Sequence, residues 1–82
     1  MNEYKPPNLG SEGNMSKSIL TNREKEVFEL LIQNRTTTEI ATKMNISEKT
    51  VRNHISNAMQ KLGVKGRAQA VVELLRMNII SL

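Results

Sequence analysis

The spacing of apolar residues along this chain changes near residue 19. From there to residue 77 they recur every three or four positions, which is the repeat of one face of an α-helix, and turn-forming residues interrupt the pattern three times. We therefore predict an all-α domain of four helices over residues 19–82. Residues 1–18 contain both prolines and few apolar side chains, so we expect a flexible N-terminal tail there.

Capping signals indicate where the first two helices start. In Thr21-Asn22-Arg23-Glu24 and again in Thr36-Thr37-Thr38-Glu39, a threonine stands three residues before a glutamate. In such a capping box the threonine hydroxyl accepts from the backbone N–H of the glutamate, and the carboxylate reaches back to the threonine N–H. We expect one helix after each of these threonines.

A very short turn separates the second helix from the third. Asn45 suits the left-handed backbone of a tight turn, Ser47 suits the start of a third helix over residues 48–62, and Gly63 suits its end. Two helices joined by so short a turn form a helix-turn-helix, whose second helix enters the major groove of DNA.

The third helix has one apolar and one polar face. Its apolar side chains are Val51, Ile55, Ala58, Met59 and Leu62. Long basic and amide side chains on the opposite face can donate to base edges, and the flanks hold donors suited to phosphates. The predicted base-contacting residues are Lys49, Arg52, Asn53 and Ser56, and Lys49 also suits a phosphate. The predicted phosphate-contacting residues are Thr50, His54, Asn57 and Lys61.

The positive charge of the chain is concentrated around the same helix. The formal net charge is +4, and residues 48–67 contain five basic residues against Glu48, a difference that accounts for the whole excess. A basic excess on one helix and its following loop is typical of a protein that binds a polyanion. The alternative is a solvated face that happens to be basic.

The residue inventory argues against several other functions. With no cysteine and one histidine, we expect no metal site, and without a glycine-rich phosphate loop we expect no catalytic residue and no cofactor. One Phe and one Tyr are too few to stack the bases of a single strand. No apolar run approaches the roughly 20 residues that cross a membrane, and no leader opens the chain. We expect a cytoplasmic protein.

The fourth helix, predicted over residues 67–77, is apolar on more than one side, and residues 78–82 either extend it or pack loosely. A surface helix needs one apolar stripe, so the remainder would form an exposed patch of the kind that marks an interface. We predict a two-fold homodimer that brings two recognition helices to successive major grooves. The alternative is a monomer that encloses this helix. The predicted interface residues are Ala70, Val71, Leu74, Leu75 and Met77.

Residues 20–77 resemble the DNA-binding domain of the LuxR family of bacterial transcription regulators, through the stretches LTNREKEVFELL, TEIATKMNISEKTVRNHISNAMQKL and GRAQAVVELL. The resemblance implies a four-helix fold, a dimer through the last helix and binding to operators near promoters. It implies base contacts at Arg52, Asn53 and Ser56, with backbone contacts near Thr50, His54 and Lys61. Many relatives attach this domain to a receiver or ligand-binding domain, for which this chain is too short.

More narrowly, residues 46–77 resemble a stand-alone member of this family that controls late spore-coat genes. We therefore predict a sequence-specific regulator that binds double-stranded DNA, activates some promoters and represses others, with RNA polymerase as a further candidate partner. Two alternatives are a promoter-reading module like that of a sigma factor, which would act through RNA polymerase, and a helical adaptor that binds only protein.

Overall fold

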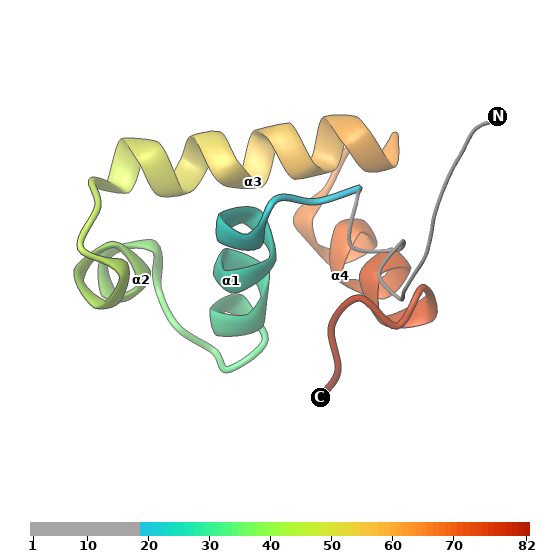
Figure 1. The fold of residues 1–82 in the computed structure, drawn as a ribbon, viewed down its shortest axis with the longest axis horizontal. Helices are drawn as coiled ribbons and strands as arrows, with labels where there is room; N and C mark the ends of the chain where they lie inside the picture. The colour runs from blue at the N-terminus through green and yellow to red at the C-terminus, as the bar shows by residue number, and fades with distance from the viewer. Residues whose placement is uncertain (1–18) are drawn as a thin grey trace, which may run out of the picture.

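The computed structural model describes residues 19–82, which form four α-helices and no strand. The helices are α1 (Asn22–Leu31), α2 (Thr37–Met44), α3 (Glu48–Leu62) and α4 (Arg67–Arg76). α3 lies along one side of the molecule, and α1, α2 and α4 pack against the same side of it (Figure 1). The predicted all-α fold is confirmed, whereas the predicted tail lies outside the described residues. No helix in this part of the chain is long and apolar enough to cross a membrane.

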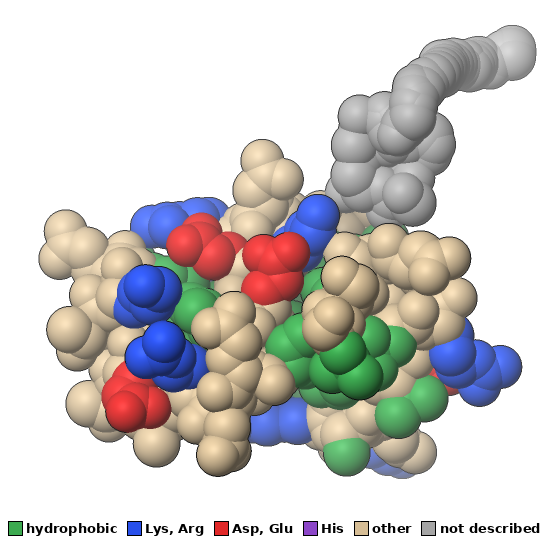
Figure 2. Space-filling view, turned by 90° about the horizontal axis from the view of Figure 1, so that it is seen from below, with side chains coloured by type: hydrophobic (Ala, Val, Ile, Leu, Met, Phe, Trp, Pro, Cys, Tyr) green, Lys and Arg blue, Asp and Glu red, His purple; other side chains and the backbone are tan. Residues whose placement is uncertain are grey.

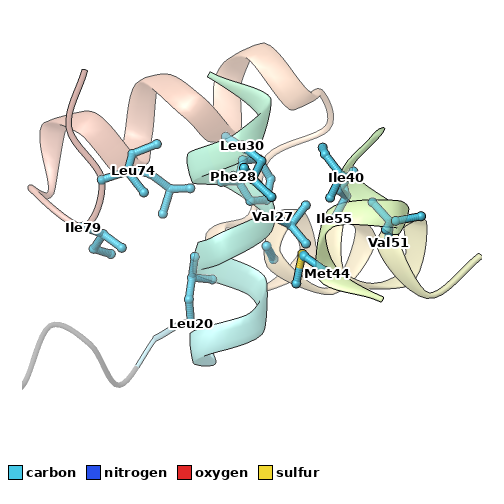
Figure 3. Packing of buried hydrophobic residues seen from close by; sticks show 14 residues of the cluster. Leu20, Val27, Phe28, Leu30, Ile40, Met44, Val51, Ile55, Leu74 and Ile79 are labelled. Atoms are coloured by element: carbon cyan, nitrogen blue, oxygen red, sulfur yellow. The ribbon is translucent and has the colours of Figure 1, made fainter. Parts of the chain in front are cut away.

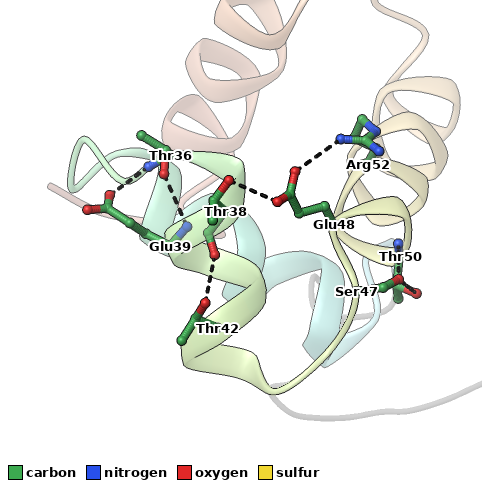
Figure 4. Close-up of polar contacts among 8 residues, drawn as sticks. All are labelled: Thr36, Thr38, Glu39, Thr42, Ser47, Glu48, Thr50 and Arg52. Carbon is green, nitrogen blue, oxygen red and sulfur yellow. Dashed lines mark hydrogen bonds and ion pairs between the residues drawn. The ribbon is translucent and has the colours of Figure 1, made fainter.

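Local hydrogen bonds fix the start of the first three helices. Thr21 Oγ1 accepts from the backbone N–H of Glu24 at 3.1 Å, and Glu24 Oε1 accepts from the Thr21 N–H at 2.9 Å. Thr36 and Glu39 repeat both bonds at the start of α2 (Figure 4). The Ser47 hydroxyl accepts from a backbone N–H in the first turn of α3 at 3.0 Å. Because one such cap stabilises a helix by about 1 kcal/mol, these starts are set by the local sequence.

Left-handed residues end the helices and keep the turns short. Asn45 follows α2 with a φ of 59°, and Gly63 follows α3 with a φ of 70°, both at predicted turn positions. Asn34 and Asn78 adopt the same conformation after α1 and α4. Asparagine and glycine tolerate positive φ better than other residues, so they turn the chain where the helices end, and only residues 45–47 separate α2 from α3.

α1 lies at the centre of the hydrophobic core. Val27 and Phe28 have no exposed surface, and they lie between two groups of apolar side chains (Figure 3). One group comes from α2 and α3 and the other from α4 and the residues that follow it; the labelled members are Ile40, Met44, Val51 and Ile55 in the first, and Leu74 and Ile79 in the second. α1 therefore joins the helix-turn-helix to α4.

Residues 78–82 neither extend α4 nor pack loosely throughout, which were the two expectations from the sequence. The helix ends at Arg76, one residue before the predicted end, and Asn78 then turns the chain at positive φ. As a result Ile79 and Ile80 turn back into the core, where both are buried. Leu82, by contrast, is 95% exposed.

The face opposite α3 differs from the polar face of that helix. Figure 2 shows acidic and basic side chains mixed on this opposite face, with a hydrophobic patch in the region of α4 and the C-terminus. An open hollow at its edge is lined by Glu29, Ile32, Gln33, Ser81 and Leu82. Within residues 19–82 the acids and bases outside residues 48–67 cancel in number, so the basic excess belongs to α3 and the loop after it.

We expect Ile80→Ala to lower the free energy of unfolding by about 2–4 kcal/mol, because it leaves a cavity beside the packed end of α4. Leu82→Ala is the matched control, since its side chain is almost fully exposed and its removal should change stability by less than about 0.5 kcal/mol. Urea unfolding of both variants checks this. Equal stability of the two variants would contradict the packed C-terminal segment.

Candidate nucleic-acid interface

The two faces of α3 are separated as predicted. Val51, Ile55 and Ala58 are buried, and Met59 and Leu62 are half-buried against the core. The opposite face is open to solvent within residues 19–82. All four predicted base-contacting residues lie exposed on it: Lys49, Arg52, Asn53 and Ser56. One helix thus presents an ammonium, a guanidinium, an amide and a hydroxyl on a convex, uncovered surface, which matches the donor-rich chemistry that reads base edges in the major groove.

The guanidinium of Arg52 has an acidic neighbour one turn earlier. Arg52 Nη1 lies 3.6 Å from Glu48 Oε1, and the Arg52 side chain remains 56% exposed. Glu48 Oε2 accepts a hydrogen bond of 2.9 Å from the Thr38 hydroxyl of α2 (Figure 4). Sequence reasoning assigned Glu48 only to the first turn of α3. Its contact with α2 depends on how the two helices cross.

The flanks of α3 hold the predicted phosphate-contacting residues in different environments. Asn57 is exposed, whereas His54 and Thr50 are half-buried. The Thr50 hydroxyl lies 2.9 Å from the Ser47 hydroxyl, so part of its hydrogen-bonding capacity is used within the cap (Figure 4). Of these three side chains, Asn57 is therefore the most open to solvent.

Lys61 is tied to the core of the molecule. Its Nζ donates a hydrogen bond of 2.7 Å to Glu24 Oε1 of α1, and its side chain is 39% exposed. Glu24 itself is buried, the only polar or charged residue in residues 19–82 that is. The pair fixes the C-terminal half of α3 on the N-terminus of α1. Lys61 therefore has a structural partner that its position on the helix surface did not reveal.

Glu24 is the residue whose role the sequence reasoning underestimated. The capping box accounts for its place at the start of α1, yet Glu24 also stands three and four residues before Val27 and Phe28. That spacing places it on the buried face of α1. An acid in register with an apolar stripe is a sequence signal for a buried partner, and here the partner is Lys61, 37 positions later in the chain.

The contacts of Glu24 keep its carboxyl ionised. Burial, the largest single influence, would raise the pKa of Glu24. The hydrogen bonds from Lys61 and from the Thr21 N–H, with the charges of Lys61 and His54, outweigh it and hold the pKa below its usual range. Because the folded pKa is the lower one, the stabilisation is complete above the usual glutamate range. It is lost as the pH falls through the folded value.

α4 divides its apolar side chains between the core and the surface. Ala70 and Leu74 have no exposed surface, because both are buried in the core of their own chain. The prediction that these two residues form a dimer interface is therefore wrong. Val71 and Leu75 are half-buried against that core, and Met77 is 41% exposed. The sequence reasoning missed Val72, which is 50% exposed and lines a shallow hollow with Val64, Ala68, Gln69 and Glu73.

A short helix, a tight left-handed turn and a longer helix with one uncovered basic face define a helix-turn-helix domain of the DNA-binding type. Residues 18–74 match the family described as bacterial regulatory proteins, luxR family. The chain belongs to this family. The matched residues include both helices of the motif, α2 and α3. The match favours a LuxR-type transcription regulator over the sigma-like module and over the adaptor that binds only protein.

Individual relatives agree with this assignment. The chain is 75% identical over 67 residues to the spore germination protein GerE of Bacillus subtilis. The aligned residues cover 82% of this chain and 90% of that protein. It is 48% identical over 58 residues to the transcriptional regulatory protein DegU of Brevibacillus brevis, but spans only 25% of that protein. A solved structure of the transcription factor GerE matches with a TM-score of 0.75 and 57% identity, covering 77% of this chain and 94% of that one.

We expect Lys61→Met to lower the free energy of unfolding by about 1–3 kcal/mol at neutral pH, because Glu24 is left buried without its partner. The loss should shrink as the pH falls from the usual glutamate range through the lowered folded pKa of Glu24, below which the carboxyl is protonated in both proteins. Urea unfolding across this pH range provides the measurement. Lys65→Met removes a charge from the following loop and serves as the control. A loss for Lys61→Met that is independent of pH would contradict the ion pair.

Proposed function

We propose that this chain is a sequence-specific regulator that inserts α3 into the major groove of double-stranded DNA. The observation that carries the proposal is the separation of the faces of α3: the apolar residues are held in the core, and the donor-rich face is uncovered. In this arrangement Arg52 would make a paired contact to guanine and Asn53 to adenine. Lys49 and Ser56 extend the same surface toward neighbouring base pairs.

Phosphate contacts would set the register of the helix on the duplex without reading its sequence. Asn57, Thr50 and His54 flank the reading face on α3 and are suited to this role. Lys61 can join them only through the part of its ammonium that Glu24 does not use, so we assign it a smaller share than its charge suggests.

The similarity to the spore germination protein GerE supports a role in sporulation. We propose that the chain acts in the cytoplasm on late sporulation genes, including spore-coat genes, as an activator at some promoters and a repressor at others. Activation would involve contact with RNA polymerase bound beside the operator.

A homodimer through α4 would place two copies of α3 on successive major grooves. The side chains available for it are the outward ones, Val72 and Met77, together with the half-buried Val71 and Leu75. The shallow hollow beside Val72 gives the partner a recess to fill.

Two substitutions distinguish the proposed base contacts from the proposed phosphate contacts. Arg52→Ala should relax base preference at one operator position by about 1–3 kcal/mol, because a bidentate contact is lost. Asn57→Ala should weaken selected and scrambled duplexes alike, because a phosphate contact carries no sequence information. Selection of bound duplexes from a random pool identifies the operator for these measurements. Identical behaviour of the two variants would contradict this division of roles.

The dimer is tested by Val72→Glu, which should shift the chain to monomer in sedimentation equilibrium because a charge would be buried in the apolar interface. Thr42→Glu places the same charge on the exposed surface of α2 and should leave the association unchanged. Interfaces of standard size have dissociation constants from micromolar to picomolar. A wild-type chain that remains monomeric at tens of micromolar would therefore contradict the proposed dimer.

A further inference from the structure

Glu48 is the one acid in the basic segment 48–67, and both of its oxygens are engaged. Oε1 lies 3.6 Å from Arg52 Nη1, and Oε2 accepts from the Thr38 hydroxyl at 2.9 Å. Figure 4 shows the three side chains in a row from α2 to the exposed face of α3. The row connects the first helix of the helix-turn-helix with the side chain best suited to read guanine.

An acid at this position needs an explanation, because it lies beside a surface that would meet phosphates. Its charge complements the start of α3, but that role requires no contact with a neighbouring helix. The helix start is already capped by Ser47. Neither contact of the carboxylate is needed to start α3. Together the two contacts link Thr38 of α2 to Arg52 on the exposed face of α3.

We propose that Glu48, held by Thr38, is a positioning residue that determines specificity by orienting the Arg52 guanidinium toward a base. This inference rests on the proposed function. Arg52 carries five N–H donors in a rigid fork, and Glu48 lies against Nη1 only. In residues 19–82 no other acid pairs with Arg52, so the edge formed by Nε and Nη2 stays available for the two acceptors of a guanine.

The same contact disfavours unspecific binding. A free arginine swings between conformations and reaches a phosphate on any duplex, whereas one restrained by a carboxylate loses part of this freedom and part of its net charge. An isolated pair one turn apart on an exposed helix surface is weak. The Thr38 hydrogen bond matters for that reason: it fixes the carboxylate, so that only the arginine remains to be ordered.

Thr38→Val tests the proposal without changing any charge. We expect this variant to lose roughly threefold or more in the ratio of affinity for the selected operator to affinity for a scrambled duplex, because Arg52 must then be ordered on binding. Affinity for the scrambled duplex should not fall, since a released Arg52 reaches phosphates at least as readily, and the salt dependence of binding should stay at the wild-type value because no charge is changed. The loss of preference should fall on the same operator position that Arg52→Ala relaxes.

Glu48→Gln tests the same row from the other helix. It should lower the ratio as well, because the released Arg52 reaches phosphates on any duplex. Removal of a repulsive charge near the phosphates should in addition raise the affinity for operator and scrambled duplex alike. In the double variant the two losses of ratio should not add, because both substitutions release the same arginine.

Three controls separate positioning from general effects. Thr38→Ser keeps the hydroxyl and should restore the wild-type ratio. Thr42→Val removes a hydroxyl of α2 whose one hydrogen bond within residues 19–82 goes to the Thr38 carbonyl. Glu26→Gln removes an acid paired with Arg23 on α1, and neither variant should change the ratio. Urea unfolding of each variant measures any loss of folded protein, for which the affinities are then corrected.

The outcomes distinguish this inference from the proposed function. A selective wild-type chain with an equally selective Thr38→Val variant overturns the inference alone, as does a loss that affects operator and scrambled duplex equally. A wild-type chain that selects no sequence overturns the proposed function, and the inference with it.

Discussion

The burial of one side of α3 against α1 is the contact on which the rest of the molecule depends. Val51, Ile55 and Ala58 fix the rotation of the helix about its axis, and a rotation of half a turn would hide Arg52 and Asn53. α1 can hold α3 because Val27 and Phe28 are enclosed from both sides, by the helix-turn-helix and by α4 with its returning C-terminal residues. The reading face is thus a consequence of core packing.

Two polar connections further restrain the position of α3. Lys61 and Glu24 join the far end of α3 to the start of α1, and Glu48 with Thr38 joins its near end to α2. The first is partly buried, with Glu24 enclosed and Lys61 39% exposed, and we expect its loss to lower stability. The second is exposed and contributes little to folding. Placed at opposite ends of one helix, they restrain its position against sliding while leaving the face between them free.

Local features of this fold were predictable from the sequence, and contacts between distant residues were not. The capping boxes, the left-handed Asn45 and the two faces of α3 depend on residues within a few positions of one another, so the patterns suffice. Lys61 was predicted as a phosphate contact because the helical repeat gives a face but no partner 37 residues away. α4 is apolar on several sides, so its sequence did not reveal that Ala70 and Leu74 face inward while Val72 faces outward.

The most direct test of the account is an NMR titration of the labelled chain with its selected duplex, followed through side-chain amide signals. Asn53 and Asn57 lie exposed on α3, and Gln33 lies exposed at the end of α1 beside the opposite face. If the outer face of α3 enters the major groove, the signals of Asn53 and Asn57 shift strongly and that of Gln33 stays unchanged. Large shifts at Gln33 with unchanged signals on α3 would contradict this placement of the helix.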